Sequence, residues 1–466
     1  MRLVSVVVAA CVCACGSVEK QHSDAAVDAP PTVDATPMVD APVAPQIASV
    51  SPAKGIVTTA VTISGSRFGA AQGSVTIGGA AATVATWSDT SIALTVPDVL
   101  PGDADVVVTT AAGSSPPATF QVILPPAIYL ENDVAGADTF DSVSALAFDP
   151  GTGAVTQIGQ PVTMGVAPSG YGGCSTSIYV HAHTRHLFAA AGGKVAVYTI
   201  DPVTGGITPI TGSPFDAGGA RSFAVMTNAA GNRLFVANYD GHNVGVFDVA
   251  ADGTPTPVAG SPFTAPFAID TLALSKDETF LYVNSYGASY TGFSVASNGA
   301  LTALAAQNTG GTGIMRRPGT DQLLIPSSSN TLGVWSVAAD GSVTPITGSP
   351  FALNGGGTTQ TGAFTPDGGR VYFGPYGTGN IIGYSLAADG TPTALTGSPW
   401  SFATSLSSIS CVAVSQDSGY LVAVGENQQK VGVFALDTAG TPTQVTSSPF
   451  TFLPASSSAS GLAITF

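Results

Sequence analysis

Three histidines lie within six residues, at His181, His183 and His186. Imidazole is the commonest metal ligand in proteins, so this run is a candidate metal site. A closed zinc site, however, needs four ligands. We therefore predict a solvated turn here, with no metal bound.

A second group of residues could carry acid–base chemistry: Arg221, Asp240, His242 and Asp270. If the fold brings them to one opening, an imidazole or a carboxylate could act as the general base that opens a lactone. We take these four as the candidate catalytic residues. The competing interpretation is that they are polar loop residues on a structural scaffold, because function has to be argued from a site and not from a fold.

Aromatic and polar side chains near these positions are candidates for ligand binding, since tyrosines beside amides and carboxylates suit a sugar or a peptide. The candidate binding residues are Tyr239, Asn243, Tyr286, Tyr376 and Glu426. The mature region contains no Gly-x-Ser-x-Gly, phosphate-loop, His-Glu-x-x-His or Cys-x-x-Cys motif, which argues against serine hydrolase, nucleotide and zinc chemistry. We expect no cofactor.

The composition limits the partners and the fold. Charged residues make up 9% of the 466 residues, and the net charge is −16. Nucleic acids and anionic membranes attract Lys and Arg, so we exclude nucleic acid as a partner and expect membrane contact through a lipid anchor alone. The 56 glycines and 33 prolines, with abundant Val and Ile, predict an all-β protein of short strands and tight turns.

Residues 1–15 have the pattern of an export signal. Met1 and Arg2 precede an apolar run, 3–14, that is too short to span a bilayer as a mature helix. The sequence VCACG at 12–16 resembles the lipobox of bacterial lipoproteins, which implies lipidation of Cys15. Cys11 is the alternative, as is an ordinary cleaved signal. We expect an exported lipoprotein of the outer membrane or cell surface, or else a periplasmic or secreted protein.

Two segments precede the main body of the chain. Residues 16–44 are rich in Asp, Ala and Pro and predict a disordered tether. Residues 45–123 alternate short β segments with turns, as in a sandwich. The motifs VTISGSRFG at 61–69 and WSDT at 87–90 resemble an IPT/TIG domain, which implies an immunoglobulin-like interaction or spacer module without catalytic residues.

A nine-residue phrase recurs through residues 126–466. It reads ITPITGSPF at 207–215 and returns at 255–263, 343–351, 392–400 and 442–450, with degenerate copies at 154–162 and 301–308. Each period holds four expected strands, which in the third copy are 223–227, 234–237, 244–249 and 255–259. Four strands at such a period are blades of a β-propeller, and seven copies predict seven blades.

The two ends of this region predict how the ring closes. Residues 127–132 align with the second strand of other copies, so the first blade lacks its first strand, and 460–466 supplies it. This pairing leaves no open sheet edge. Within the phrase, we expect Gly212-Ser213-Pro214 to turn the chain towards the next blade and Phe215 to pack between blades. The degenerate copies predict the least regular junctions.

Repeats of the form LFVAN, VxVF and LTPxxGSPF are similar to the lactonase-like seven-bladed β-propeller family, which includes bacterial 6-phosphogluconolactonase. Enzymes of that family carry a Pro-His motif, whereas no histidine follows a proline here. In such propellers the binding mouth is built from loops before the first and after the second strand of each blade. The resemblance therefore implies that the candidate catalytic residues lie at the mouth and that the histidine run lies on the opposite face.

Two hypotheses of function follow. The first is an exported, lipid-anchored cell-envelope protein whose propeller and IPT-like domain bind a protein or a polysaccharide, without catalysis. The second is an extracytoplasmic lactonase. The missing Pro-His motif favours the first. We also expect a monomer. We expect Cys174 and Cys411 to be two buried or partly buried thiols and not a disulfide, because blade one separates the blades that carry them.

Overall fold

The computed structural model describes residues 43–134, 141–166, 176–287, 290–305, 311–359, 361–425, 428–452 and 457–466. Within these ranges the regular elements are strands, as predicted, apart from one short 3₁₀ turn, η1 (Ala182–Thr184). None of the described helical structure is long and apolar enough to cross a membrane. The predicted signal, both candidate lipidation cysteines and the tether up to residue 42 lie outside the described residues.

Two sheets that share one core form the N-terminal domain. One sheet has the order β1 (Gln46–Ser51), β3 (Ala60–Ser66), β7 (Ser91–Thr95), β6 (Thr83–Trp87); the other has β2 (Lys54–Gly55), β10 (Ala118–Val122), β8 (Gly102–Thr110), β4 (Ser74–Ile77), β5 (Ala80–Ala81), with β9 (Gly113–Ser114) beside β8. In β3, Val61 and Ile63 are buried in this core while Ala60 and Thr62 are exposed. This period of two is that of a strand with one face on the core, and it confirms the predicted sandwich.

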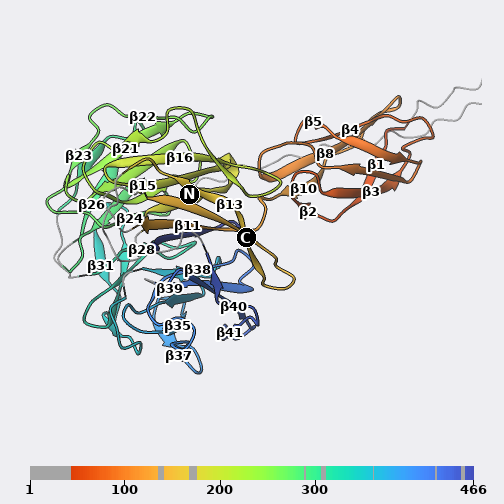
Figure 1. Cartoon of the computed structure of the whole chain (residues 1–466). Coiled ribbons are helices and arrows are strands. Elements are labelled where there is room, and N and C mark those ends of the chain that lie inside the picture. The colour runs from red at the N-terminus through yellow and green to blue at the C-terminus, as the bar shows by residue number, and fades with distance from the viewer. Residues whose placement is uncertain are drawn as a thin grey trace, which may run out of the picture. The chain divides into compact units, whose positions relative to one another are not determined.

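The remaining described strands form seven antiparallel sheets, one for each predicted blade (Figure 1). From first to fourth strand, blade one is β43 (Ser457–Ile464), β11 (Ala127–Val134), β12 (Ser142–Phe148), β13 (Val155–Thr163); blade two is β14 (Ile178–His181), β15 (His186–Ala191), β16 (Lys194–Ile200), β17 (Ile207–Pro209); blade three is β19 (Ser222–Thr227), β20 (Arg233–Asn238), β21 (Asn243–Val249), β22 (Pro255–Pro257); blade four is β24 (Thr271–Leu274), β25 (Phe280–Asn284), β26 (Tyr290–Val295), β27 (Leu301–Ala303).

The same order continues around the ring. Blade five is β28 (Met315–Arg316), β29 (Gln322–Pro326), β30 (Thr331–Val337), β31 (Val343–Pro345); blade six is β33 (Gly362–Phe364), β34 (Arg370–Phe373), β35 (Asn380–Leu386), β36 (Pro392–Ala394); blade seven is β38 (Ile409–Val414), β39 (Tyr420–Gly425), β40 (Lys430–Leu436), β41 (Pro442–Gln444). The second strand β15 is buried at every residue, and the second strands of blades three to seven are buried at every residue except the first. Neighbouring blades cover both faces of each sheet, so these strands are continuously apolar and do not alternate.

The C-terminal strand completes blade one, as predicted. β43 pairs with β11 in the register Ile128↔Ile464, and the Ala127 amide donates to Thr465 Oγ1 at 2.9 Å. The ring of Phe466 stacks on Phe148 with centroids 3.9 Å apart. The sheet of blade one is therefore built from both ends of the propeller.

The recurring phrase has a different place from the one predicted. In blade two, β17 and β18 (Phe215–Asp216) both pair with β16, one at each end of that strand. The Gly-Ser-Pro turn therefore interrupts the outer edge of a single blade and does not carry the chain to the next one. The corresponding second pieces in later blades are β23 (Phe263–Thr264), β32 (Phe351–Ala352), β37 (Trp400–Ser401) and β42 (Phe450–Thr451).

The serine of the phrase repairs this interruption. Its hydroxyl accepts the third-strand amide that would otherwise lose its partner at the turn: Val197 to Ser213 at 2.9 Å, Val246 to Ser261 at 2.9 Å, Val334 to Ser349 at 2.9 Å, Gly383 to Ser398 at 3.1 Å and Val433 to Ser448 at 2.8 Å. Buried backbone amides have to be paired, so a serine is needed at this point in each copy.

The other predicted role of the phrase is confirmed. Phe215 packs into the apolar cluster that joins blades two and three. Blades one and four, whose copies are degenerate, lack the second outer piece among the described residues; in blade one β13 is a single strand, whose pairing with β12 shifts register between Val143 and Ala145.

A belt of side-chain bonds links each blade to the next. The second strand of every blade donates to, or pairs with, the backbone of the hairpin between the third and fourth strands of its neighbour. The bonds are Tyr129 to Gly205, His186 to Asp252, Arg233 to Ser297, Tyr282 to Gly341, Gln322 to Asp389, Tyr372 to Gly440 and, across the seam, Tyr420 to Pro150. These bonds run from each blade to the next in the same direction around the whole ring.

The prediction for Cys411 is wrong, because this residue is disulfide-bonded and is not a thiol. It lies in β38, a first strand, and the first strands of blades two, one and seven contact one another in succession. Counting blades along the ring therefore overestimates distances near its centre. Cys174 lies outside the described residues.

Candidate functional site

The predicted mouth residues gather on blades three and four, where first strands begin and second strands end. Arg221 directly precedes β19, and Tyr239 and Asp240 directly follow β20. The Tyr239 amide donates to the Arg221 carbonyl at 2.9 Å, which joins the two loops. Asp270 precedes β24 in the same way, and its Oδ2 accepts the amide of Tyr286 at 2.5 Å.

Arg221 is held by aromatic rings. Its guanidinium carbon lies 5.0 Å from the centroid of Phe223 and 5.2 Å from that of Tyr239. Its Nη1 is 3.3 Å from Asp240 Oδ1, and the side chains of the pair are 39% and 45% exposed. Such an exposed ion pair adds little stability. The rings orient the guanidinium while its charge stays within reach of a ligand.

Asp270 is the acid of this site. It is 5% exposed, and its Oδ1 is buried with no hydrogen-bond partner among the described residues. Burial raises the pKa of Asp270 to about 6, against the opposing effects of the Tyr286 amide bond and the charge of Arg221. A carboxyl group with a pKa close to neutrality can take up or release a proton at working pH.

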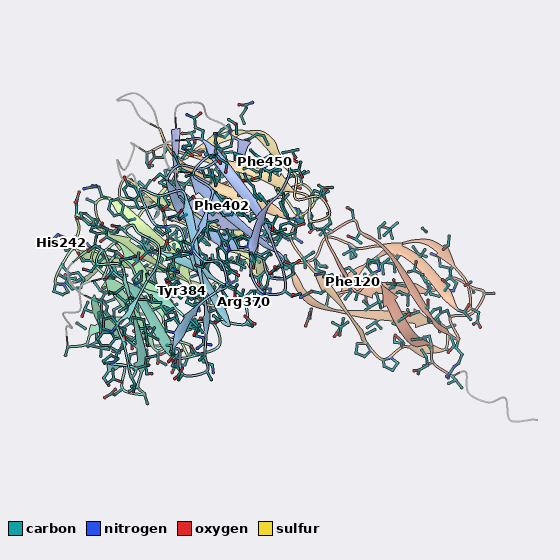
Figure 2. All side chains as sticks on the ribbon, turned by 90° about the horizontal axis from the view of Figure 1, so that it is seen from below. Phe120, His242, Arg370, Tyr384, Phe402 and Phe450 are labelled. Atoms are coloured by element: carbon teal, nitrogen blue, oxygen red, sulfur yellow. The ribbon has the colours of Figure 1, made fainter. Side chains whose placement is uncertain are left out.

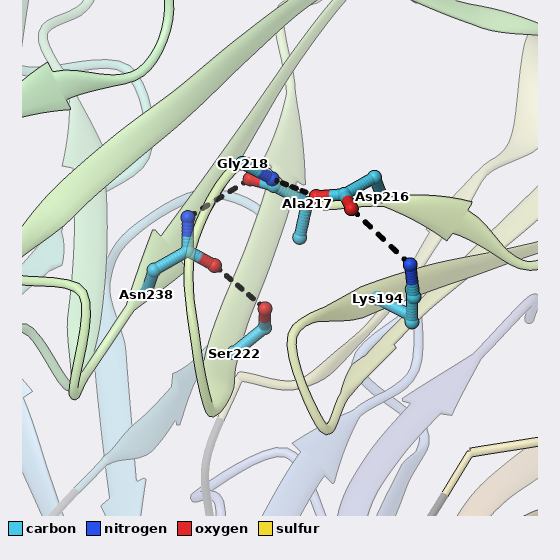
Figure 3. Close-up of polar contacts among 6 residues, drawn as sticks. All are labelled: Lys194, Asp216, Ala217, Gly218, Ser222 and Asn238. Atoms are coloured by element: carbon cyan, nitrogen blue, oxygen red, sulfur yellow. Dashed lines mark hydrogen bonds and ion pairs between the residues drawn. The ribbon is translucent and has the colours of Figure 1, made fainter.

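The loops that carry these residues are fixed by Asn238, which ends β20 (Figure 3). Its Nδ2 donates to the Ala217 carbonyl at 2.9 Å and to Asn243 Oδ1 at 2.8 Å, and its Oδ1 accepts the Ser222 hydroxyl at 2.6 Å. Because Ser222 follows Arg221, this network sets where the arginine stands. Asn238 is the last residue of the recurring LFVAN motif, which could have marked it, but it was not predicted as a site residue.

Figure 3 also shows how the preceding loop is tied to blade two. Asp216 Oδ1 accepts the Gly218 amide at 2.8 Å, and its Oδ2 lies 3.2 Å from Lys194 Nζ. The amide of Asn243, a candidate binding residue, is also used inside the protein, since its Nδ2 donates to the Gly241 carbonyl at 3.0 Å. Asn243 therefore supports the loop.

His242 lies in the loop after β20, which also carries Tyr239 and Asp240. It is exposed, with a φ of 47°, and its imidazole forms no hydrogen bond to any described residue. Its label lies at the outer edge of the propeller in Figure 2. Its backbone closes the loop, because its carbonyl accepts the Ala265 amide at 2.8 Å. A catalytic role for His242 stays a prediction.

The remaining candidates are distributed around the ring. Tyr286 is exposed and adjoins the Asp270 site. Tyr376, also exposed, follows β34 on blade six, where its amide donates to the Thr358 carbonyl at 2.7 Å. Glu426 lies outside the described residues. The structure thus brings together Arg221, Tyr239, Asp240, Asp270 and Tyr286.

A second buried carboxylate was not predicted. Glu131, on β11, is buried, and the Ser177 hydroxyl donates to its Oε2. Its charge contributes, after burial, to the raised pKa of Tyr198. It joins blades one and two below the surface, and its position inside an apolar strand gave no sign of this contact.

The histidine run is on the hairpin between the first and second strands of blade two, as predicted, but its description as a solvated turn is wrong for two of its members. His181 and His186 are buried. His181 Nε2 bonds to the Ala229 carbonyl at 3.0 Å, and burial lowers the pKa of both imidazoles. They link blades two and three. No group of three or more metal-binding side chains occurs in the described part of the chain.

Models of known families match segments in both domains. Residues 45–122 match the IPT/TIG domain, and residues 134–262 match the family described as lactonase, 7-bladed beta-propeller. No curated protein matches the chain.

Solved structures show the propeller fold. A protein of Bacteroides fragilis, provisionally assigned as a 6-phosphogluconolactonase, is 15% identical with a TM-score of 0.58 and covers 73% of this chain and 98% of its own. A Bacteroides uniformis protein with the same provisional assignment has 15% identity, a TM-score of 0.57 and coverages of 73% and 99%. A Lactobacillus plantarum protein has 15% identity, a TM-score of 0.58 and coverages of 73% and 99%. The chain therefore contains one segment that matches an IPT/TIG domain and another that matches the lactonase-like seven-bladed family, and it shares the propeller fold of these solved structures.

Proposed function

We propose that this is an exported protein of the cell envelope whose propeller mouth binds a polysaccharide. The arrangement of Arg221 is the observation that carries the proposal. A guanidinium oriented by two rings and left partly exposed can donate to ligand oxygens, Asp240 can accept from ligand hydroxyls, and the exposed ring of Tyr286 offers a face for stacking. Aromatic faces with a few oriented polar groups suit a polyhydroxylated ligand.

The proposal of export rests on the N-terminal sequence. The apolar run 3–14, the lipobox-like VCACG with Cys15 (or Cys11), and the polar tether up to residue 44 together favour a lipid-anchored protein at the outer membrane or cell surface. The IPT/TIG domain then acts as a spacer or as a second contact with a protein or polysaccharide, and the protein acts as a monomer.

Binding can be tested with the mature chain on an array of immobilised bacterial envelope polysaccharides. We expect Arg221→Ala to weaken binding by about tenfold or more, because both the oriented donor and its packing on the rings are lost. Lys276→Ala is the matched control, since it removes an exposed positive charge on the hairpin between β24 and β25, outside the loops that form the mouth. Equal binding by wild type and Arg221→Ala would overturn the proposal.

Asp270 favours lactone hydrolysis as a second candidate. A carboxylate with a pKa of about 6 can take a proton from the attacking water, while the nearby charge of Arg221 stabilises the oxygen on which negative charge develops. Activity would then rise with pH through about 6, since the ionised form is the base.

A panel of lactones should be tested against wild type, Asp270→Asn and His242→Ala. Saturable turnover that is lost in Asp270→Asn would establish the lactonase and replace binding as the main function. Loss in His242→Ala as well would assign the histidine to the same reaction. Absence of turnover in the wild type would leave the binding proposal in place.

A further inference from the structure

The aromatic residue of the phrase packs at the junction between its own blade and the next. Phe215 does so between blades two and three, Phe263 between three and four, Phe351 between five and six, Trp400 between six and seven, and Phe450 between seven and one. In these clusters it joins a large side chain of the next blade, such as Phe247 or Phe434. At these five junctions the phrase thus contributes a ring to the apolar cluster.

The junction between blades four and five has no such residue. The copy at 301–308 reads LTALAAQN, without an aromatic. Its apolar cluster contains Tyr282 and Tyr290 from blade four and Trp335 from blade five. Trp335 occupies the place of Phe247 in the third-strand motif, LGVW against VGVF. The phrase of blade four, like that of blade one, thus contributes no ring, and Trp335 is larger than the Phe247 that it replaces.

A pocket of about 590 Å³ opens beside Trp335. The indole is partly buried and lies opposite Pro345 on the neighbouring strand, and both line the pocket. Trp335 Nε1 has no hydrogen-bond partner among the described residues. An added Cβ at Gly333 would lie 2.7 Å from this nitrogen, so the glycine is what lets the indole lie flat on its strand. One face of the pocket is therefore an aromatic surface with a free donor.

Other residues that line the pocket carry hydroxyl groups. Ser327, Ser328, Ser329 and Thr331, from the loop after β29, line the same pocket. Ser327 and Thr331 share a hydrogen bond of 2.7 Å, which fixes their hydroxyls, while Ser328 and Ser329 are exposed. Every described residue that lines the pocket is uncharged. The lining therefore suits a neutral ligand with many hydroxyls and an apolar face.

The same junction has a second pocket, lined by residues of blades four and five. Tyr290 packs edge-on against Trp335, with centroids 6.0 Å apart, and its hydroxyl is buried with no hydrogen-bond partner among the described residues. It lines a smaller pocket of about 220 Å³. The junction between blades four and five thus has two pockets, one lined by Trp335 and the other by Tyr290.

We infer that the pocket between blades four and five binds a neutral saccharide, with Trp335 as the stacking face. Sugar rings present an apolar C–H face that packs on an indole and hydroxyls that exchange hydrogen bonds with serine, threonine and the indole N–H. The volume falls within the range of about 300–1,000 Å³ typical of small-molecule sites and suits a mono- or disaccharide. This site is separate from the Arg221 mouth and does not depend on ligand binding there.

The test uses the mature chain with cellobiose, maltose and N,N′-diacetylchitobiose as probes, followed by calorimetry and by tryptophan fluorescence. The three tryptophans, Trp87, Trp335 and Trp400, can be told apart by single substitution. We expect at least one probe to bind and to change the fluorescence. Trp335→Phe should abolish the fluorescence change, and Trp335→Ala should weaken binding by about tenfold or more. Trp400→Phe, at the blade six junction, should leave both unchanged.

Ser328→Trp guards against a folding defect in Trp335→Ala. Ser328 is exposed in its loop, so a bulky side chain there can block the pocket without disturbing the core. It should abolish binding, while Arg221→Ala in the mouth should not affect it. The inference is overturned if none of the three sugars binds, if binding survives in both Trp335→Ala and Ser328→Trp, or if glucuronic acid binds more tightly than the neutral sugars.

Discussion

Asp270 shows what one buried carboxyl group does to the stability of the propeller. Its pKa is raised to about 6 mainly by burial, so the ionised form is less favourable in the folded protein than in the unfolded chain. The resulting cost is present in full above about pH 6 and disappears as the pH falls below the unfolded value of about 4. A site residue thus makes the fold less stable at neutral pH than it could be.

Replacing Asp270 with Asn should remove this cost. The amide oxygen can still accept the Tyr286 amide, so we expect Asp270→Asn to be more stable than wild type at pH 8 by about 1–3 kcal/mol. The difference should vanish at pH 4. Urea unfolding at the two pH values measures both. A variant that is less stable than wild type at pH 8 would show that the charge of Asp270 is well compensated.

At the scale of residues, the sequence predicted which loops carry the site residues better than it predicted the burial and hydrogen bonds of those residues. Arg221, Asp240 and Asp270 could be assigned to blade-end loops from the repeat, and the structure confirms those positions. The burial of Asp270 and the role of Asn238 could not be predicted, because both depend on side chains from separate loops meeting in space. The internal hydrogen bond of Asn243 could not be predicted for the same reason, and its role in ligand binding stays a prediction.

At the scale of elements, the phrase combines a broken outer strand with a hydroxyl that repairs it. The position of the strands followed from the period, and β19 to β22 begin within two residues of their predicted starts. The place of the Gly-Ser-Pro turn did not follow, because a turn after a strand looks the same in sequence whether the chain leaves the sheet or returns to it. Only the pairing of β18 with β16 separates the two cases.

The contribution of the serine hydroxyl of the phrase to stability can be tested by substitution. Ser261→Ala would leave the Val246 amide without its acceptor, and we expect a loss of about 1–3 kcal/mol in the free energy of unfolding. Ser261→Thr retains the hydroxyl and serves as the control, with a smaller loss. Denaturant unfolding followed by circular dichroism measures both. Equal stability of Ser261→Ala and wild type would mean that water satisfies this amide.

At the scale of the whole molecule, the ring closes through the pairing of β43 with β11 and through the belt of side-chain bonds, which crosses the seam from Tyr420 to Pro150. The number of blades and the closing strand were predicted because they follow from counting repeats. The disulfide at Cys411 was missed because a linear count of blades does not measure distance near the ring axis.

Removal of residues 460–466 should therefore destabilise the entire propeller. Leu462, Ile464 and Phe466 pack into the cluster between blades seven and one, and losing them should cost on the order of 3–6 kcal/mol. We expect a lower melting temperature for the single main transition seen by calorimetry. Phe466→Ala is the graded control, with a smaller decrease. An unchanged melting profile after truncation would contradict closure by the C-terminal strand.

The position of the seam also decides how the ring responds to mechanical force. The chain enters the propeller through β11, which is hydrogen-bonded to β12 on one side and to β43 on the other. Tension on the chain before Pro125 acts along β11 and has to shear two ladders at once. The same tension applied at Phe466 would act on β43, which pairs with β11 alone among the described strands. The propeller is thus mechanically polar: it resists a pull from its N-terminal side better than a pull from its C-terminal end.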